Sequence, residues 1–238
     1  RRLKGCTGQR QKPERSIADL RASGRLNKAE SLIKQTLRAN PNDATALHQS
    51  GLIAQNKGKT GRAVQLLQRA AAAQPDAADI CCDLGLALKA LGRFDEAVEA
   101  QKNVTDLLPT SARAWSNYGT ALISAKRTED AIAAFIQAVA LDSHDPELHY
   151  NLGNALLASD DPVTAEGAFL RALKIQPNHI GALTNLGSAL KDQGRMDEAE
   201  AILRGTAILD PDNADLKWNL AIVLLTAGRF REGWAAYE

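Results

Sequence analysis

The spacing of the prolines constrains this chain more than any other feature. Five of its eight prolines lie 34 residues apart, or twice 34 where Ser143 interrupts the series: Pro41, Pro75, Pro109, Pro177 and Pro211. A period of roughly 20 to 50 residues is typical of stacked repeats, in which each repeat contacts its neighbours. The sequence therefore predicts a repeat array in place of one globular core.

Three further columns follow the same period. One is a glycine column: Gly51, Gly85, Gly119, Gly153 and Gly187. One is an alanine column: Ala29, Ala63, Ala97, Ala131, Ala165 and Ala199. A second glycine column is interrupted by Lys126 and Asp160: Gly24, Gly58, Gly92, Gly194 and Gly228.

Each repeat is predicted to be a helix, a tight turn and a second helix. Apolar residues recur three and four positions apart on both sides of the second glycine column, as in Leu84, Leu88 and Leu91, and this is helical periodicity. Glycine in that column supplies the left-handed conformation that ends the first helix. Small residues in the other two columns let helix axes approach closely, and proline closes the second helix.

Segments such as LGLALKALGRFDEAVEA and WSNYGTALISAKRTEDAIAAF resemble the tetratricopeptide repeat. The resemblance implies an all-α fold, a right-handed superhelical solenoid of stacked hairpins with a concave groove. We expect the solenoid over residues 13–238, with six full repeats opening near 10, 44, 78, 112, 146 and 180 and a partial seventh at 214. Departures from the family pattern are Ser143, Gln101 and, at the helix-crossing position of the first repeat, Ile17.

Composition excludes several classes of protein. The chain is 45% apolar and 24% charged, and it contains no apolar run long enough to cross a membrane and no secretory signal. The three cysteines, Cys6, Cys81 and Cys82, provide neither a disulfide framework nor metal-ligand spacing. We therefore expect a cytoplasmic protein. Because the chain opens on Arg1, we also expect further sequence upstream.

Charge is distributed unevenly. Residues 1–40 hold 11 Lys or Arg against three acids, and the remainder holds 18 against 25. Residues 1–12 are interpreted as a flexible basic leader. No aromatic residue or recognition motif accompanies that charge, so a solvated linker is favoured and neither nucleic acid nor membrane is expected as a partner.

A search for catalytic chemistry finds little. NKGKTGRA ends like a phosphate-binding loop, but Ile53 stands where the earlier glycine is required and no strand precedes it. The histidines have no metal-binding spacing, and Cys81 lies at a core-facing register. We expect no cofactor, no metal and no enzymatic activity in this chain.

The more informative feature is a polar ladder, again at intervals of 34: Gln49, Asp83, Asn117, Asn151, Asn185 and Asn219. This register lies one residue before a core-facing leucine column, so the ladder is expected to border the core on the groove side. A side-chain amide can donate to and accept from a peptide backbone at once. Helices packed about 8–10 Å apart would place one rung at roughly every third residue of an extended peptide. The alternative is structural, namely hydrogen bonds between helices.

Neighbouring groove registers would supply selectivity. Asn154 lies three residues after a rung, and Tyr150 and Trp218 each lie one before a rung, where an exposed aromatic ring could anchor a ligand. Trp115 and Tyr118 occupy core registers and are expected to pack. Arg113 and Lys89 do not form the paired cations of a carboxylate clamp.

Three hypotheses follow. The first is a protein-interaction scaffold that binds an extended peptide segment in the concave groove. The second is the substrate-recognition region of a larger glycosyltransferase similar to O-linked N-acetylglucosamine transferases, because GRFREGWAAYE resembles the junction to such a catalytic domain. The third is self-association through a C-terminal end that is expected to leave four residues uncovered: Leu220, Leu224, Trp234 and Tyr237.

Overall fold

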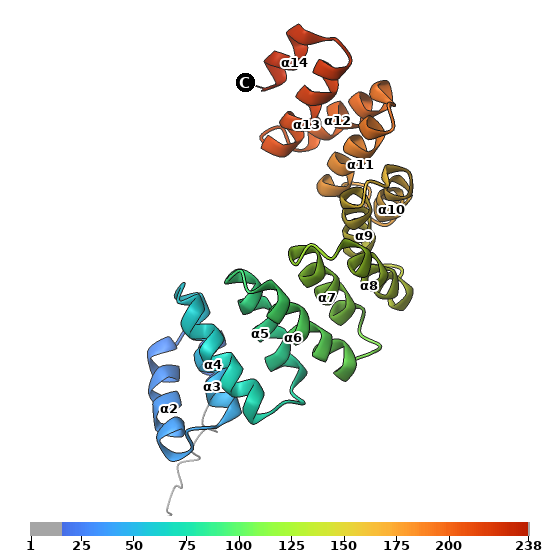
Figure 1. Cartoon of the computed structure of the whole chain (residues 1–238). Helices are drawn as coiled ribbons and strands as arrows, with labels where there is room; N and C mark the ends of the chain where they lie inside the picture. Colours follow the sequence, from blue (N-terminus) through green and yellow to red (C-terminus); the bar gives the residue numbers. More distant parts are fainter. Residues whose placement is uncertain (1–15, 238) are drawn as a thin grey trace, which may run out of the picture. The chain divides into compact units, whose positions relative to one another are not determined.

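The computed structural model describes residues 16–237, which form fourteen helices joined by turns and contain no strand. They divide into two compact units, unit 1 with residues 16–91 and unit 2 with residues 92–237. Within each unit the chain runs as successive helical hairpins (Figure 1). The all-α, stacked-hairpin fold class is thereby confirmed. The expected leader, residues 1–12, and the expected opening of the first repeat near residue 10 lie outside the described residues.

Unit 1 contains two hairpins and the first helix of the third repeat. Each helix packs against the next along the chain, and the first helices α1, α3 and α5 also contact one another in order. The bounds are α1 Ile17–Ala22, α2 Leu26–Ala39, α3 Ala44–Asn56, α4 Thr60–Ala73 and α5 Ala78–Ala90.

Unit 2 continues the same pattern with a second helix followed by four hairpins. Here the first helices α7, α9, α11 and α13 contact one another in order. The bounds are α6 Phe94–Leu107, α7 Ala112–Ser124, α8 Thr128–Leu141, α9 Pro146–Ala158, α10 Pro162–Ile175, α11 Ile180–Asp192, α12 Met196–Leu209, α13 Ala214–Thr226 and α14 Phe230–Tyr237.

The turn inside each hairpin uses a left-handed residue, as predicted. All five glycines of the turn column have φ between 70° and 79°. Lys126 (φ 59°) and Asp160 (φ 62°) adopt the same conformation without glycine's freedom. The backbone geometry of the repeat is therefore kept even where glycine is missing. At Lys126 and Asp160 it brings Cβ close to the following carbonyl oxygen, which is sterically unfavourable.

The small-residue columns lie where helices cross. Every member of the alanine column is fully buried. A Cβ added to Gly153 would lie 2.5 Å from Cε1 of Phe169, and one added to Gly187 would lie 2.6 Å from Cγ of Leu203. These distances are well inside van der Waals contact, so glycine is required for the helices of these hairpins to approach as closely as they do.

A capping column, which the sequence analysis did not identify, precedes the first helices. Side chains at this register accept a hydrogen bond from the backbone N–H three residues later, or two later at Asp145: Asp43, Ser111, Asp145, His179 and Asn213. At Ala77 the register is retained but no side chain can cap. Before Pro162, at the start of α10, the side chain of Asp161 accepts from the N–H of Thr164 at 3.1 Å.

The cores of the two units differ in composition. The buried clusters of unit 1 are aliphatic, built on residues such as Leu47, Ile53 and Leu66. All Phe, Tyr and Trp residues of the chain lie beyond residue 91, and Phe135 and Phe169 are fully packed in the clusters of unit 2. No helix within residues 16–237 combines the length and apolarity needed to cross a membrane.

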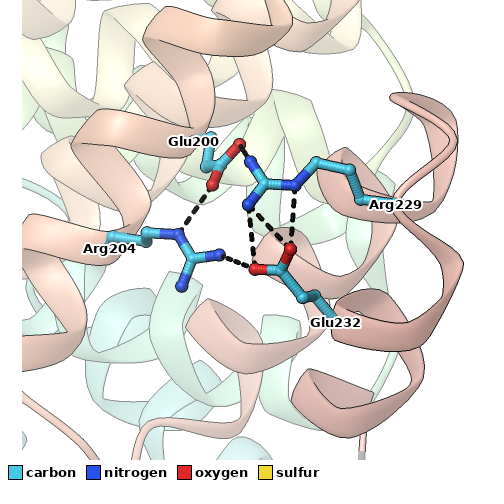
Figure 2. A network of polar contacts seen from close by, with 4 residues as sticks. All are labelled: Glu200, Arg204, Arg229 and Glu232. Atoms are coloured by element: carbon cyan, nitrogen blue, oxygen red, sulfur yellow. Dashed lines mark hydrogen bonds and ion pairs between the residues drawn. The ribbon is translucent and has the colours of Figure 1, made fainter.

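An ion-pair network joins α14 to α12 (Figure 2). Glu200 accepts from Nε of Arg204 at 2.7 Å and from Nη1 of Arg229 at 2.5 Å. Glu232 accepts from Arg229 in its own hairpin and from Nη2 of Arg204 at 2.6 Å. The four side chains close a ring, so each charge has two partners. An isolated exposed ion pair contributes about 0–1 kcal/mol to the free energy of unfolding. In this network each side chain is held by two partners, so the four side chains restrict one another's conformations.

Candidate functional site

The six ladder residues all lie on first helices at one register. Gln49 and Asp83 lie on α3 and α5 of unit 1. Asn117, Asn151, Asn185 and Asn219 lie on α7, α9, α11 and α13 of unit 2, which follow one another in contact. Within each unit, the polar side chains thus occur at equivalent places on adjacent helices.

The rungs of unit 1 are engaged within the protein. Gln49 is only 7% exposed, and its Oε1 accepts a hydrogen bond from Nε of Arg21 at 2.8 Å. Nε2 of the buried His48 lies 2.7 Å from Oδ2 of Asp83, a distance at which an imidazole N–H donates to a carboxylate. Both contacts connect neighbouring first helices.

The rungs of unit 2 are half-buried. Nδ2 of Asn185 donates to Oδ1 of Asn154 at 2.6 Å, and Nδ2 of Asn151 donates to Oγ of Ser116 at 3.5 Å, a long and weak contact. Asn117 and Asn219 are exposed to the same intermediate degree. These contacts again bridge consecutive first helices, which is the structural role anticipated as the alternative.

That structural role uses only part of each amide. A carboxamide has two N–H donors and an oxygen that accepts two hydrogen bonds. The hydrogen bond between Asn185 and Asn154 uses one N–H of Asn185 and one lone pair of the Asn154 oxygen. Asn151 and Asn154 also line a small cavity of about 140 Å³ beside Thr120. Asn151 and Asn185 therefore have the capacity to keep their contacts with the neighbouring first helix and to bind a ligand at the same time.

The two aromatic anchor candidates differ from each other. Tyr150 is half-buried, not exposed as expected: its ring lies 4.9 Å from that of His179 and against the backbone of Gly181, where the missing side chain makes room. Trp218 is 52% exposed and lies 5.6 Å from the ring of Tyr237.

Trp115 and Tyr118 pack against the buried cluster of unit 2, as predicted. The expectation of an uncovered C-terminal end is only half right. Leu220 and Leu224 are buried, 9% and 1% exposed, because α11, α12 and α14 enclose α13. Trp234 and Tyr237 do remain exposed, at 57% and 55%.

A second set of site-forming residues was missed by sequence reasoning. At the fourth position of the first helices, three unlike side chains satisfy the backbone carbonyl six residues earlier. Sγ of Cys81 lies 3.7 Å from the carbonyl oxygen of Pro75, Nε1 of Trp115 lies 2.9 Å from that of Pro109, and Nε2 of His149 lies 3.0 Å from that of Ser143. Burial, with the charge of Asp79 adding to it, raises the pKa of the Cys81 thiol and keeps the S–H available to donate. These three side chains share only the ability to donate a hydrogen bond at the same register. Because the residue types differ, the sequence does not show them as one column.

Within residues 16–237, no cluster of three or more His, Cys, Asp or Glu side chains is arranged to hold a metal ion. The arrangement is one of hydrogen-bonding amides on helices.

Comparison with known proteins gives matches along almost all of the described chain. Family models described as tetratricopeptide repeat match residues 18–78, 52–118, 156–208 and 190–233, and one described as TPR repeat matches residues 119–160. No curated protein sequence matches this chain.

Several solved structures share the fold. The MamA protein is 25% identical over 69% of this chain and 90% of its own, with a TM-score of 0.63. YrrB, described as a TPR protein with an unusual peptide-binding site, is 18% identical over 83% of this chain and 97% of its own, with a TM-score of 0.64. A tetratricopeptide repeat protein from Parabacteroides merdae is 18% identical over 81% of this chain and 77% of its own, with a TM-score of 0.73.

Proposed function

This chain belongs to the tetratricopeptide repeat family, and from that premise we propose that it is a non-catalytic scaffold that binds an extended peptide segment along its first helices. The observation that carries the proposal is the series of half-buried amides at one register of the first helices of unit 2. Asn residues are poor helix formers, and four of them recur at one register where alanine would favour the helix. The solved structure of YrrB, with its peptide-binding site, agrees with a peptide as occupant.

The contact residues divide by unit. In unit 2 we assign contact with the peptide backbone to five side-chain amides: Asn117, Asn151, Asn154, Asn185 and Asn219. The exposed ring of Trp218 would contact a peptide side chain. The half-buried Tyr150 would contribute the part of its ring that remains accessible. Gln49 and Asp83 in unit 1 are already held by Arg21 and His48. We expect them to contribute less, because a ligand would have to displace those contacts.

The glycosyltransferase alternative has no specific support. The family matches extend over repeats, and the half-buried amides fit binding without implying a particular reaction. No second function is therefore proposed.

The test is a double substitution, Asn151→Ala with Asn185→Ala. Random peptides displayed on phage would be selected on the wild-type chain, and the affinity of the selected peptides measured by calorimetry for both proteins. Two lost amide contacts, each contributing about 0.5–1.5 kcal/mol, are expected to weaken binding by about tenfold.

The matched control is Asn103→Ala, an exposed asparagine on α6 outside the ladder, which should leave affinity unchanged. Thermal unfolding of each variant separates binding from folding. If the double variant lost stability and kept its affinity for the selected peptides, the ladder would be a purely structural device and the proposal would fail.

A further inference from the structure

A second site lies in unit 1, away from the ladder. Residues of α2, α3 and α4 line a cavity of about 350 Å³, within the range of roughly 300–1,000 Å³ typical of ligand sites. Its floor is apolar: Ile33, Leu37, Ile53, Ala54 and Leu66. Its rim is cationic: Lys34, Lys57, Lys59, Arg62 and Arg69. Glu30 is the single acid among the lining residues, and no ladder residue lines the cavity.

Three of the rim cations make no direct side-chain contact with an acid within residues 16–237. Lys57 pairs with Glu30, and Nη2 of Arg69 donates to the carbonyl of Pro41 at 2.7 Å. Lys34, Lys59 and Arg62 are exposed and make no side-chain hydrogen bond or ion pair to any residue in the described part of the chain. The pKa of the Glu30 carboxyl is lowered first by its hydrogen bond to Lys57 and then by the charges of Lys57, Lys34 and Lys59.

Four other hairpins have an ion pair at a turn where the second repeat has none. At the turn into the second helix, an Arg pairs with an acid three residues later in four repeats: Arg93 with Glu96, Arg127 with Asp130, Arg195 with Glu198 and Arg229 with Glu232. In the second repeat the same two registers hold Lys59 and Arg62, and in the first repeat they hold Arg25 and Lys28, which do not line the cavity. Two cations at a helix N-terminus are opposed by the helix dipole as well as by each other. This arrangement costs stability in the free protein, and an anionic ligand would relieve it.

We propose that this cavity binds an acidic peptide segment of a partner protein, with an apolar side chain on the aliphatic floor and carboxylates against Lys34, Lys59 and Arg62. Charge complementarity supports the choice, because residues 21–69 hold nine Lys or Arg and only two acids. Single-stranded nucleic acid is disfavoured because unit 1 has no Phe, Tyr or Trp side chain on which a base could stack. A small inorganic anion would leave the apolar floor unused.

The test uses the full chain and a fluorescein-labelled peptide of alternating Glu and Leu, with binding followed by anisotropy. The decisive variant is Arg62→Glu, which restores the acid found in four other repeats. It should weaken peptide binding by about tenfold or more, while its melting temperature stays at or above that of the wild type because Lys59 gains a partner. The matched control is Lys28→Glu, the same register one repeat earlier and outside the cavity, which should change affinity by less than about twofold.

Four results would overturn the site: unchanged affinity in Arg62→Glu, an equal loss in Lys28→Glu, equal binding of a peptide with every Glu replaced by Lys, or tighter binding of an oligothymidylate of the same net charge. The factor by which Arg62→Glu weakens binding of the Glu-Leu peptide should be the same in the wild-type chain and in the ladder variant Asn151→Ala with Asn185→Ala, because no ladder residue lines the cavity. Failure at this cavity is thus distinguishable from failure of the ladder proposal.

Discussion

At the scale of single residues, glycine has two separate jobs in this chain. In the hairpin turns it supplies a left-handed backbone, which Lys126 and Asp160 supply at a steric cost. Inside the first helices it supplies space, because the partner helix carries Phe or Leu directly opposite. Gly167, in the middle of α10, has neither role, because a Cβ there would meet no atom within 4 Å.

This contrast makes a paired prediction for one hairpin. Gly153→Ala should destabilise unit 2 by roughly 1–3 kcal/mol, because the new methyl group must displace the Phe169 ring. Gly167→Ala should stabilise it by about 0.5–1 kcal/mol through helix propensity alone. Urea denaturation of both variants checks the pair. If both variants changed the free energy of unfolding by the same amount, the Phe169 ring would move aside at no energetic cost.

At the scale of elements, every first helix from α3 onward except α5 begins after a residue whose side chain accepts a hydrogen bond from a free N–H of the first turn. Ala77 has the extended conformation of a cap, φ −82° and ψ 95°, close to the φ −90° and ψ 107° of Ser111. Only the accepting oxygen is absent. The helix α5 therefore begins without the hydrogen bond that its counterparts have.

We predict that Ala77→Ser stabilises unit 1 by about 1 kcal/mol, since the backbone already has the capping geometry. The reciprocal change, Ser111→Ala, should destabilise α7 in unit 2 by a similar amount. Far-ultraviolet circular dichroism during thermal unfolding measures both. A neutral Ala77→Ser would show that solvent already satisfies the N–H groups at the start of α5.

At the scale of the whole molecule, the period predicted the architecture because every repeat must present the same small residues where helices cross. It could not predict which contacts individual side chains make across repeats. Tyr150 was expected to be exposed, but it packs because Gly181 lies opposite it on the next first helix. Similarly, the period did not predict that Lys59 and Arg62 lack the ion pair that other hairpins form at the same registers. The capping column was present in the sequence at the same period, hidden by the variety of residues that can cap.

Acid should weaken the fold throughout both units. Five carboxyl groups have pKa values below their ordinary range, because of hydrogen bonds from the residue named with each: Glu30 from Lys57, Glu96 from Arg93, Asp161 from Thr164, Glu198 from Arg195 and Glu232 from Arg229. A lowered folded-state pKa means that the ionised carboxylate stabilises the fold. That contribution is complete above the ordinary glutamate value of 4.5 and is lost as the pH falls below it.

The melting temperature is therefore expected to be level from pH 7 to about 5 and to decline toward pH 3. High salt should flatten the decline, because four of the five groups are exposed ion pairs. A melting temperature independent of pH across this interval would show that the pairs contribute nothing measurable.

The division of aromatic side chains between the units makes the chain its own reporter. Trp115, Trp218 and Trp234 lie near the beginning and the end of unit 2, while unit 1 has no chromophore beyond its peptide bonds. Intrinsic fluorescence will follow unit 2 alone, and amide absorption will follow both. Subtracting one melting curve from the other isolates the loss of unit 1, with its cationic cavity, without any label or truncation.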